Sequence, residues 1–259
     1  MSTSSNPLPL DGAVVVVTGG NSGIGLGMSK GLVAAGASVS IWGRNEGKNE
    51  RAAEELRSVR DGADILPLRC DVSDLDAIVA AMDRTVHELG PLTACVANAG
   101  VSQGAPFLDI DPETWRSTMA VNLDGVFFTL QTAARQMVAQ GTPGALVATS
   151  STSTVHGAPN NAHYGASKSG VIGLVKAAAV ALARHQIRVN ALVPGWTKAD
   201  LTEELFKNEK FATAALKRTP VRRWGEPSDF ADIAVYLCNP AHGFHTGDSV
   251  LIDGGYTTF

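Results

Sequence analysis

Residues 13–35 read AVVVVTGGNSGIGLGMSKGLVAA and decide the fold. The valine-rich run at 13–17 suits a parallel strand that is buried on both faces, and 26–35 suits a helix that Gly36 ends. The glycines between them let the backbone approach a diphosphate closely, and the helix N-terminus offers free N–H groups. This order of strand, glycine loop and helix predicts a dinucleotide site, although a tight turn without a ligand is the alternative. The predicted contacts are Gly19, Asn21, Ser22, Gly23, Ile24 and Gly25.

Short apolar runs alternate with helical segments along the rest of the chain. The runs predict strands at 39–42, 65–70, 93–97, 144–149, 187–193 and 249–252. Helices are predicted at 46–60, 74–89, from Asp111 onward through Asn122, at 163–184 and at 227–237. This alternation predicts an α/β fold, a Rossmann-type doubly wound parallel sheet of about seven strands with helices on both faces. We expect a single domain over 1–259, with a disordered tail at 1–9 and a mobile flap over the site at 198–219.

The predicted strands end in residues that suit a binding crevice. Thr18, Asn98, Ser151 and Pro194 each follow a strand, and Asn98 is continued by the small residues Ala99 and Gly100. In open parallel sheets the carboxyl ends of the strands line the ligand crevice, so these positions should meet at one edge of the sheet.

Tyr164 and Lys168 are four residues apart on a predicted helix, and Ser151 precedes the tyrosine by thirteen positions. A spacing of four places the phenol and the ammonium on one helix face. The positive charge should lower the pKa of Tyr164 toward neutrality, so that it can exchange protons with an alcohol or ketone oxygen. The motif is short, and a purely structural role is the alternative.

The end of the second predicted strand bears on the choice of cofactor. In dinucleotide folds this position meets the adenosine ribose, where a carboxylate selects NAD. Here Gly43 stands in its place and Arg44 follows, and a guanidinium can hold the 2′-phosphate of NADP. We therefore favour NADP(H) and keep NAD(H) open, since Arg44 can also be an ordinary surface residue. Asp71 is a candidate for the adenine end, while Asp74 can simply cap the next helix.

Composition and charge argue against several classes of partner. The chain has 259 residues, 44% of them hydrophobic, and a formal charge of −4, with no basic run to bind nucleic acid or an anionic membrane. We expect no membrane span, since no window reaches the ~18 apolar residues that a span needs, and the first ten residues lack signal-peptide features. Cys70, Cys95 and Cys238 suggest reduced thiols in a cytoplasmic protein. No histidine cluster suggests a metal site.

Together these motifs resemble the short-chain dehydrogenase/reductase family over about residues 10–256. TGGNSGIG resembles its cofactor loop, Asp71-Val72 its adenine contact and Asn98-Ala99-Gly100 its central-sheet motif. The resemblance implies a catalytic tetrad with Tyr164 as general acid/base and Lys168 lowering its pKa and binding the nicotinamide ribose. It further implies that Ser151 holds the substrate oxygen and Asn122 anchors a water in a proton relay. Pro194-Gly195 would border the nicotinamide.

One position departs from the family pattern. A threonine often stands five residues after the proline of Pro194-Gly195, where this chain has Ala199, so we expect Thr197 or backbone groups to hold the carboxamide. Candidate substrate contacts besides Ser151 are His156, His163 and Trp196. The resemblance implies hydride transfer between NAD(P)(H) and a small-molecule secondary alcohol or ketone by a homotetramer or homodimer. A catalytically idle, dinucleotide-sensing regulator of the same fold is the alternative, although the intact Ser151, Tyr164 and Lys168 argue against it.

Overall fold

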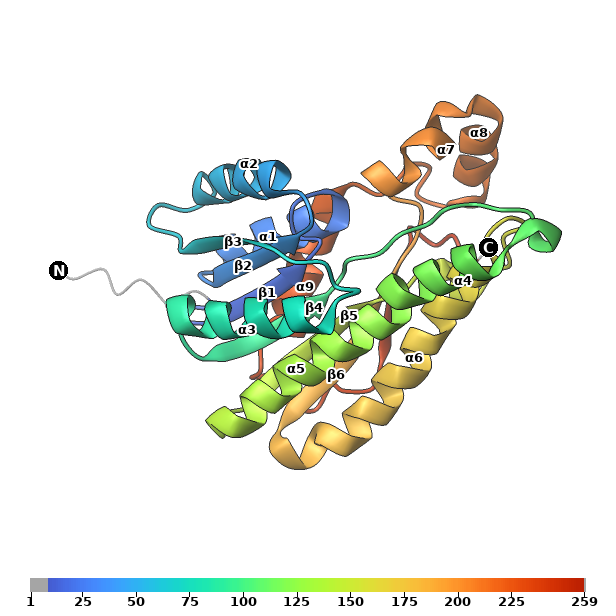
Figure 1. The fold of residues 1–259 in the computed structure, drawn as a ribbon. Helices are drawn as coiled ribbons and strands as arrows, with labels where there is room; N and C mark the ends of the chain where they lie inside the picture. The colour runs from blue at the N-terminus through green and yellow to red at the C-terminus, as the bar shows by residue number, and fades with distance from the viewer. Residues whose placement is uncertain (1–8, 259) are drawn as a thin grey trace.

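The core of the fold is a parallel sheet of seven strands in the order β3-β2-β1-β4-β5-β6-β7 (Figure 1). The computed structural model describes residues 9–258. The strands are β1 (Val14–Thr18), β2 (Ser38–Gly43), β3 (Ile65–Arg69), β4 (Leu92–Ala97), β5 (Gly144–Thr149), β6 (Ile187–Pro194) and β7 (Ser249–Ile252). The sequence-based prediction of a Rossmann-type parallel sheet is confirmed, and the expected tail at 1–9 lies almost wholly outside the described residues.

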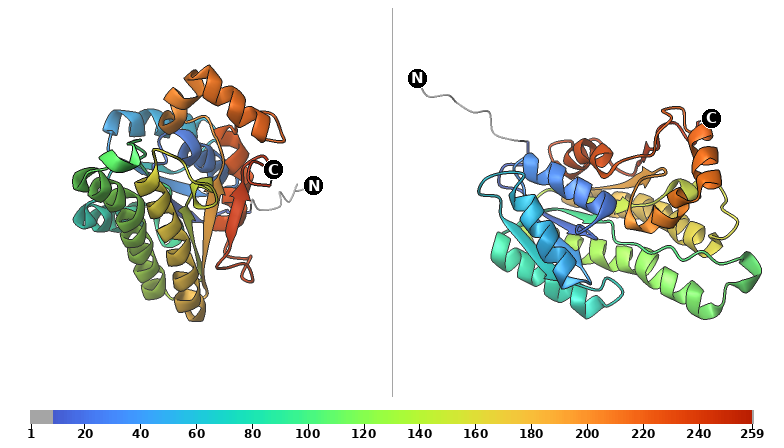
Figure 2. Two further views of the ribbon diagram at one scale, coloured as in Figure 1. Left: turned by 90° about the vertical axis from the view of Figure 1, so that its right-hand side faces the viewer. Right: turned by 90° about the horizontal axis from the view of Figure 1, so that it is seen from above.

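Helices cover both faces of the sheet, as Figures 1 and 2 show. One apolar core packs α3, α5 and α6 against one face, and a second packs α1, α2 and α9 against the other. The helices are α1 (Gly23–Ala34), α2 (Glu46–Arg57), α3 (Leu75–Leu89), α4 (Pro112–Met119), α5 (Gly125–Gln140), α6 (Ala162–Leu182), α7 (Glu203–Lys207), α8 (Glu209–Arg218) and α9 (Ala231–Cys238).

The side of the sheet on which successive strands are added changes at β1. From β1 the chain builds outward through β2 and β3, and it then returns to add β4 on the other side of β1. The connecting loops at the carboxyl ends of β1 and β4 consequently run in opposite directions and leave a crevice between them. The valines of β1 are at most 3% exposed, which explains their unbroken apolar run.

The long helix expected from Asp111 onward is interrupted at its middle. A π-helical turn, Ala120–Asp124, separates α4 from α5 and contains Asn122. Gly125 follows this turn, and a Cβ on it would lie 2.6 Å from the backbone oxygen of Val72. The helix thus passes very close to the loop after β3, and the widened turn places Asn122 toward the sheet. Single π turns of this kind are frequent at functional sites.

The expectation that no segment is long and apolar enough to cross a membrane was wrong for residues 162–185. This helical stretch has a mean hydropathy of 1.4, and only 28% of its most apolar window is buried. Its alanines raise the hydropathy, yet it also carries Lys168 and Lys176. Because α6 packs along β6 and beside α5, its apolar inner face belongs to the core of the fold.

The stretch 198–219 forms a short 3-10 turn, Asp200–Thr202, followed by α7 and α8. The helical pattern expected there is confirmed. These helices stand away from the sheet and its covering layers at the carboxyl-end side (Figures 1 and 2).

Candidate active site

A single cavity of about 850 Å³ runs along the carboxyl ends of β1, β2, β4, β5 and β6. It begins at the glycine loop and Arg44, passes Asn98 and Lys168, and ends among aromatic side chains near Trp196. The convergence of strand ends expected from the sequence therefore produces one continuous site. Its volume and its course along five strand ends suit an extended ligand with a second, smaller molecule at the far end.

The glycine loop is shaped for close approach of a diphosphate. Gly19 and Gly23 have φ values of +64° and +49°, a region that side chains disfavour. A Cβ on Gly25 would lie 2.1 Å from the backbone oxygen of Gly19, so only glycine permits this packing. Ser22 precedes α1 without capping it through its side chain, which leaves the first N–H groups of the helix open to phosphate oxygens. The residues present thus fit a dinucleotide.

Asn98 ties the central strands together at the floor of the cavity. Its backbone N–H donates to Thr18 Oγ1 at 2.9 Å, and its side-chain amide donates to the Thr18 carbonyl at 3.1 Å. Its Oδ1 accepts from Thr149 Oγ1 at 3.2 Å. The side chain predicted to contact the cofactor therefore also fixes the mutual positions of β1, β4 and β5.

Gly43 and Arg44 lie at the adenosine end of the cavity. A Cβ on Gly43 would lie 2.3 Å from Asn21 Nδ2, because Asn21 reaches over this glycine and donates to Asn49 Oδ1 at 2.6 Å. Asn49 is 2% exposed and donates to the carbonyls of Gly43 and Leu68. The sequence analysis did not identify Asn49, whose side-chain amide is buried although most of helix α2 is polar.

Of the two roles considered for Asp71 and Asp74, Asp74 takes that of the helix cap and Asp71 stands where the adenine contact was expected. Asp74 caps α3 by accepting from the backbone N–H groups of Asp76 and Ala77. Asp71 lines the cavity and accepts from the backbone and hydroxyl of Ser73 at 3.0 and 2.7 Å. Burial raises the pKa of Asp71, but the two bonds from Ser73 and the nearby arginines outweigh this effect and lower it overall. A carboxylate is thus present where the adenine contact was expected.

Lys168 is buried at the centre of the site. It is 3% exposed, and its Nζ donates to the Thr149 carbonyl at 2.9 Å and lies 5.8 Å from the centroid of the Tyr164 ring. Burial lowers its pKa to about 8. Gly100 faces it closely, since a Cβ there would lie 3.4 Å from Nζ.

The expected fall in the pKa of Tyr164 is wrong for the protein without its cofactor. Burial raises the pKa of Tyr164, and a hydrogen bond with Ser151 offsets only part of that rise. The sequence argument counted the attraction of an ammonium but could not include the cost of removing both groups from water. Ser151 is itself held in place, since its Oγ accepts from the backbone N–H of Ser153 at 3.1 Å.

Asn122 is fully buried, and both polar atoms of its side chain form hydrogen bonds with other residues. Its Oδ1 accepts from the Val101 N–H, and its Nδ2 donates to the Val101 carbonyl, both at 2.8 Å. The same Nδ2 donates to Ser167 Oγ at 3.3 Å. Asn122 therefore joins the loop after β4 to α6 beside Lys168, and its part in a proton relay remains a prediction.

The candidate substrate residues separate into two groups. Ser151, His156 and Trp196 line the cavity. His163 does not: it is fully buried, and its Nε2 pairs with the Gln103 carbonyl at 2.8 Å, so its expected contact with substrate is corrected to a role in holding the loop after β4. Tyr256 lines the cavity and was missed. Its position just after β7, at the same edge of the sheet, was the available signal.

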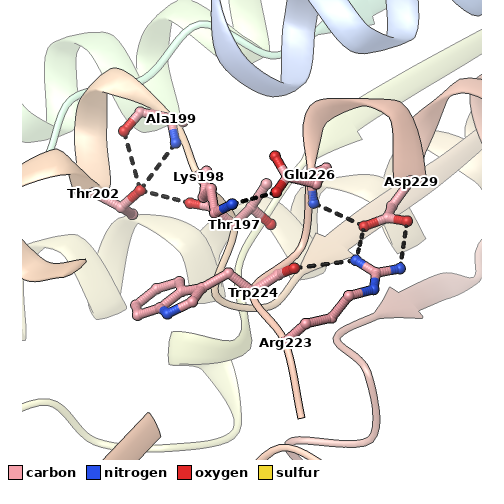
Figure 3. A network of polar contacts seen from close by, with 8 residues as sticks. All are labelled: Thr197, Lys198, Ala199, Thr202, Arg223, Trp224, Glu226 and Asp229. Atoms are coloured by element: carbon pink, nitrogen blue, oxygen red, sulfur yellow. Dashed lines mark hydrogen bonds and ion pairs between the residues drawn. The ribbon is translucent and has the colours of Figure 1, made fainter. Parts of the chain in front are cut away.

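The segment after Pro194-Gly195 is held by a polar network, shown in Figure 3. Thr197 is 3% exposed, and its Oγ1 donates to the Gly195 carbonyl at 3.1 Å, so its side chain is already engaged by protein. Thr202 donates to the Thr197 carbonyl and accepts from the Ala199 N–H at 3.2 Å. The Thr202 hydroxyl thus holds the backbone of Ala199, whose own side chain has no hydroxyl. The contact of Thr197 with the carboxamide remains a prediction.

The comparisons with known proteins agree with this geometry. A family model described as enoyl-(acyl carrier protein) reductase matches residues 19–257. Gluconate 5-dehydrogenase of Gluconobacter oxydans is 35% identical, with 96% of each chain covered. The NADP-dependent (R)-specific alcohol dehydrogenase of Lentilactobacillus kefiri is 37% identical, covering 96% of this chain and 98% of its own.

A solved structure shows the same arrangement of elements. The gluconate 5-dehydrogenase of Burkholderia cenocepacia, in complex with NADP and tartrate, superposes with a TM-score of 0.91 at 34% identity, covering 98% of each chain. Both the sequence matches and the fold extend over nearly the whole chain. The protein therefore belongs to the short-chain dehydrogenase/reductase family of NAD(P)-dependent oxidoreductases.

Proposed function

We propose that this protein interconverts a small-molecule secondary alcohol and its ketone with NADP(H) as the preferred cofactor, and that Ser151, Tyr164 and Lys168 form its catalytic group. The observation that supports this most directly is the placement of the three side chains along one cavity that begins at a diphosphate cradle. NAD(P)(H), when bound, supplies or accepts the hydride. The glycine loop, Asp71, Lys168 and the Pro194-Gly195 segment are the residues that would hold it.

The protein itself contributes a proton donor and acceptor and holds the substrate oxygen in position. The Tyr164 hydroxyl gives a proton to the substrate oxygen in reduction and takes it back in oxidation. Ser151 hydrogen-bonds Tyr164 and is placed to stabilise charge that develops on the same oxygen. Lys168 favours the phenolate only while it is protonated, so proton donation by Tyr164 to the substrate oxygen is assisted most below about pH 8. Asn122 keeps the neighbouring loop in place.

The preference for NADP(H) rests on Arg44. It lines the adenosine end of the cavity, and Gly43 beside it carries no carboxylate that would repel a 2′-phosphate. The relatives from Lentilactobacillus kefiri and Burkholderia cenocepacia, described as NADP-dependent and as an NADP complex, support the same choice.

The relatives also suggest hydroxylated substrates. Their names include gluconate 5-dehydrogenase, galactitol 2-dehydrogenase and cis-4-hydroxycyclohexanecarboxylate dehydrogenase. Polar groups of Ser153, Asn161 and His156 line the far end of the cavity beside Trp196 and Tyr256, which suits an alcohol that carries further polar groups. A panel of gluconate, galactitol, cyclic hydroxy acids and simple alcohols, followed by NADPH absorbance, would rank these classes.

Tyr164→Phe is the decisive variant for the catalytic assignment. We expect turnover to fall by about 10²- to 10⁴-fold, because the proton donor is lost while the ring remains. NADP binding, followed through tryptophan fluorescence, should stay near that of the wild type. Tyr236→Phe is the matched control, since Tyr236 stacks on His242 outside the cavity. A Tyr164→Phe protein with wild-type turnover would exclude the proposed acid/base role.

Exposed apolar side chains and the state of the cysteines bear on assembly and location. Trp115 on α4, Phe127 on α5 and Val180 on α6 are 43%, 38% and 82% exposed, which supports burial of this helical face against a second copy in a homotetramer or homodimer. The three cysteines are free and buried, which is compatible with the cytoplasm.

A further inference from the structure

Two residues that line the cavity form an exposed ion pair. Lys48 Nζ lies 2.8 Å from Asp200 Oδ2, and both residues line the cavity. Lys48 belongs to the first turn of α2, where its backbone N–H donates to the capping Asn45 at 2.9 Å. Asp200 begins the 3-10 turn that leads into α7 and α8. The pair therefore joins the adenosine-binding side of the site to the segment above its substrate end.

Lys48 lies close in sequence to Arg44 and shares its end of the cavity. Arg44 stands one residue after β2 and Lys48 four residues later, where the chain has turned into α2. No ion pair within residues 9–258 involves Arg44, whereas Lys48 is paired with Asp200. Two cations at one end of a cavity suit a phosphate better than a ribose hydroxyl.

The partner of Lys48 is one that a phosphate can displace. The two side chains are 48% and 62% exposed, and an exposed ion pair contributes little to stability because water and salt screen it. A phosphate monoester carries about −1.5 to −2 charges near neutral pH and three strong acceptor oxygens. It therefore offers the ammonium a stronger partner than the carboxylate does.

The turn that carries Asp200 is anchored on the side away from Lys48. The Lys198 N–H donates to the Gly225 carbonyl at 2.9 Å, and Lys198 Nζ pairs with Glu226 (Figure 3). On the cavity side, a Cβ on Gly23 would lie 2.9 Å from Ala199 Cβ, so the turn rests on the glycine loop. Loss of Asp200 from Lys48 would thus leave the base of the segment in place.

We propose that Lys48 is a second ligand of the 2′-phosphate of NADP(H) and that Asp200 competes with this phosphate for the Lys48 ammonium. Asp200 then sets how strongly the site prefers NADP(H) over NAD(H). The proposal rests on the NADP(H) preference assigned above to Arg44, and it adds a residue from outside the glycine loop and outside the strand end. It also links the phosphate of the cofactor to the segment above the substrate.

The test compares two ligands that differ by one phosphate, adenosine 2′,5′-bisphosphate and adenosine 5′-monophosphate, by calorimetry on the full chain. We expect Lys48→Ala to weaken the bisphosphate about tenfold, the loss of one charge-assisted contact, and to leave the monophosphate unchanged. Asp200→Asn should strengthen the bisphosphate several-fold, again without effect on the monophosphate. Lys30→Ala breaks the exposed Lys30–Glu55 pair outside the cavity and should change neither affinity.

The double variant separates competition from a general effect of charge. In the Lys48→Ala background, Asp200→Asn should no longer improve binding of the bisphosphate, because the contested ammonium is gone. An equal gain in both backgrounds would overturn the competition, and equal weakening of both ligands by Lys48→Ala would overturn the phosphate contact. A wild-type protein that prefers the bisphosphate but is unaffected by Lys48→Ala would refute this proposal alone. Equal wild-type affinities would refute the NADP(H) preference as well.

Discussion

At the scale of single residues, burial governs the chemistry of Tyr164 and Lys168. The two side chains stand on one face of α6, as their spacing predicts, but the pKa of Tyr164 is raised rather than lowered. Lys168 loses water on all sides and gains only a neutral carbonyl, that of Thr149, so its own pKa falls. A negative or polar partner from the ligand is what would restore the ammonium as a strong electrostatic influence.

The lowered pKa of Lys168 predicts a pH dependence of stability. Between about pH 8 and the ordinary lysine value of 10.5, the unfolded chain binds a proton that the folded chain does not, so stability from this group rises with pH. Relative to Lys168→Met, the wild type should gain about 1–2 kcal/mol of unfolding free energy between pH 7.5 and 9.5. Urea unfolding of both proteins at the two pH values measures this gain. A difference that stays constant with pH would contradict the buried, proton-releasing lysine.

Arg44 is the residue on which the choice of cofactor depends most directly. Arg44→Ala should weaken NADP binding about tenfold or more, because a charge-assisted contact is lost, and it should change NAD binding little. Titration of each oxidised cofactor against protein fluorescence measures both affinities. Arg84→Ala, which removes an exposed arginine of α3 outside the cavity, is the control. Equal losses for both cofactors would show that Arg44 acts on the shape of the site and not on a phosphate.

At the scale of elements, the site depends on connections that hold loops to strands. Asn98 joins β1, β4 and β5, and Asn122 joins the loop after β4 to α6. The position of Asn122 is not explained by local propensity, since an asparagine inside a helix is mildly unfavourable. In both residues the side-chain amide nitrogen and oxygen are hydrogen-bonded to protein, and Asn122 is in addition fully buried. The π turn at Ala120–Asp124 is the backbone adjustment that allows Asn122 to form these bonds.

The network around Asp229 anchors the start of the segment above the substrate end (Figure 3). Asp229 accepts two bonds from Arg223, at 2.6 and 2.8 Å, and one from the Glu226 N–H at 2.7 Å. Asp229→Ala should lower the unfolding free energy by about 1 kcal/mol and raise the rate of proteolysis within residues 198–219. Chemical denaturation and limited proteolysis measure these effects. Glu88→Ala, which breaks the exposed Arg84–Glu88 pair, should leave both nearly unchanged. Equal unfolding free energies and equal proteolysis rates for the two variants would show that Asp229 does not anchor this segment.

At the scale of the whole molecule, each of the helices α4, α5 and α6 exposes a large apolar side chain, namely Trp115, Phe127 and Val180. This explains why α6 is apolar enough to resemble a membrane segment although its inner face packs in the core. Exposed apolar side chains of this kind suit contact with a second copy of the chain, as proposed above.

Val180→Glu tests that contact. Val180 is 82% exposed on α6, so a charged side chain should be tolerated by the single chain but should oppose burial against a partner. We expect the wild type to have the mass of a tetramer or dimer in light scattering and the variant to shift toward smaller species. Val59→Glu, at an exposed position just after α2, is the control. A monomeric wild type would contradict the proposed assembly.

The sequence by itself determined the sheet, its helices and the edge at which the chemistry lies. The valine run at 13–17, the glycine loop and the alternation of short apolar runs with helical segments are local signals, and local signals are sufficient to place strands and helices in order. Asn98, Ser151 and Pro194 line one cavity and Thr18 is hydrogen-bonded to Asn98, so these strand ends meet as expected, because strand ends in a parallel sheet share one edge.

Only the tertiary structure decided what depends on burial and on contacts between distant segments. Burial raises the pKa of Tyr164. His163 is bonded to Gln103 and lies outside the cavity, whereas Tyr256 lines the cavity. The tertiary structure also pairs Lys48 with Asp200, which are 152 positions apart. Desolvation and long-range pairing have no periodicity and no fixed spacing in the chain, so they become visible only when the folded molecule brings their participants together.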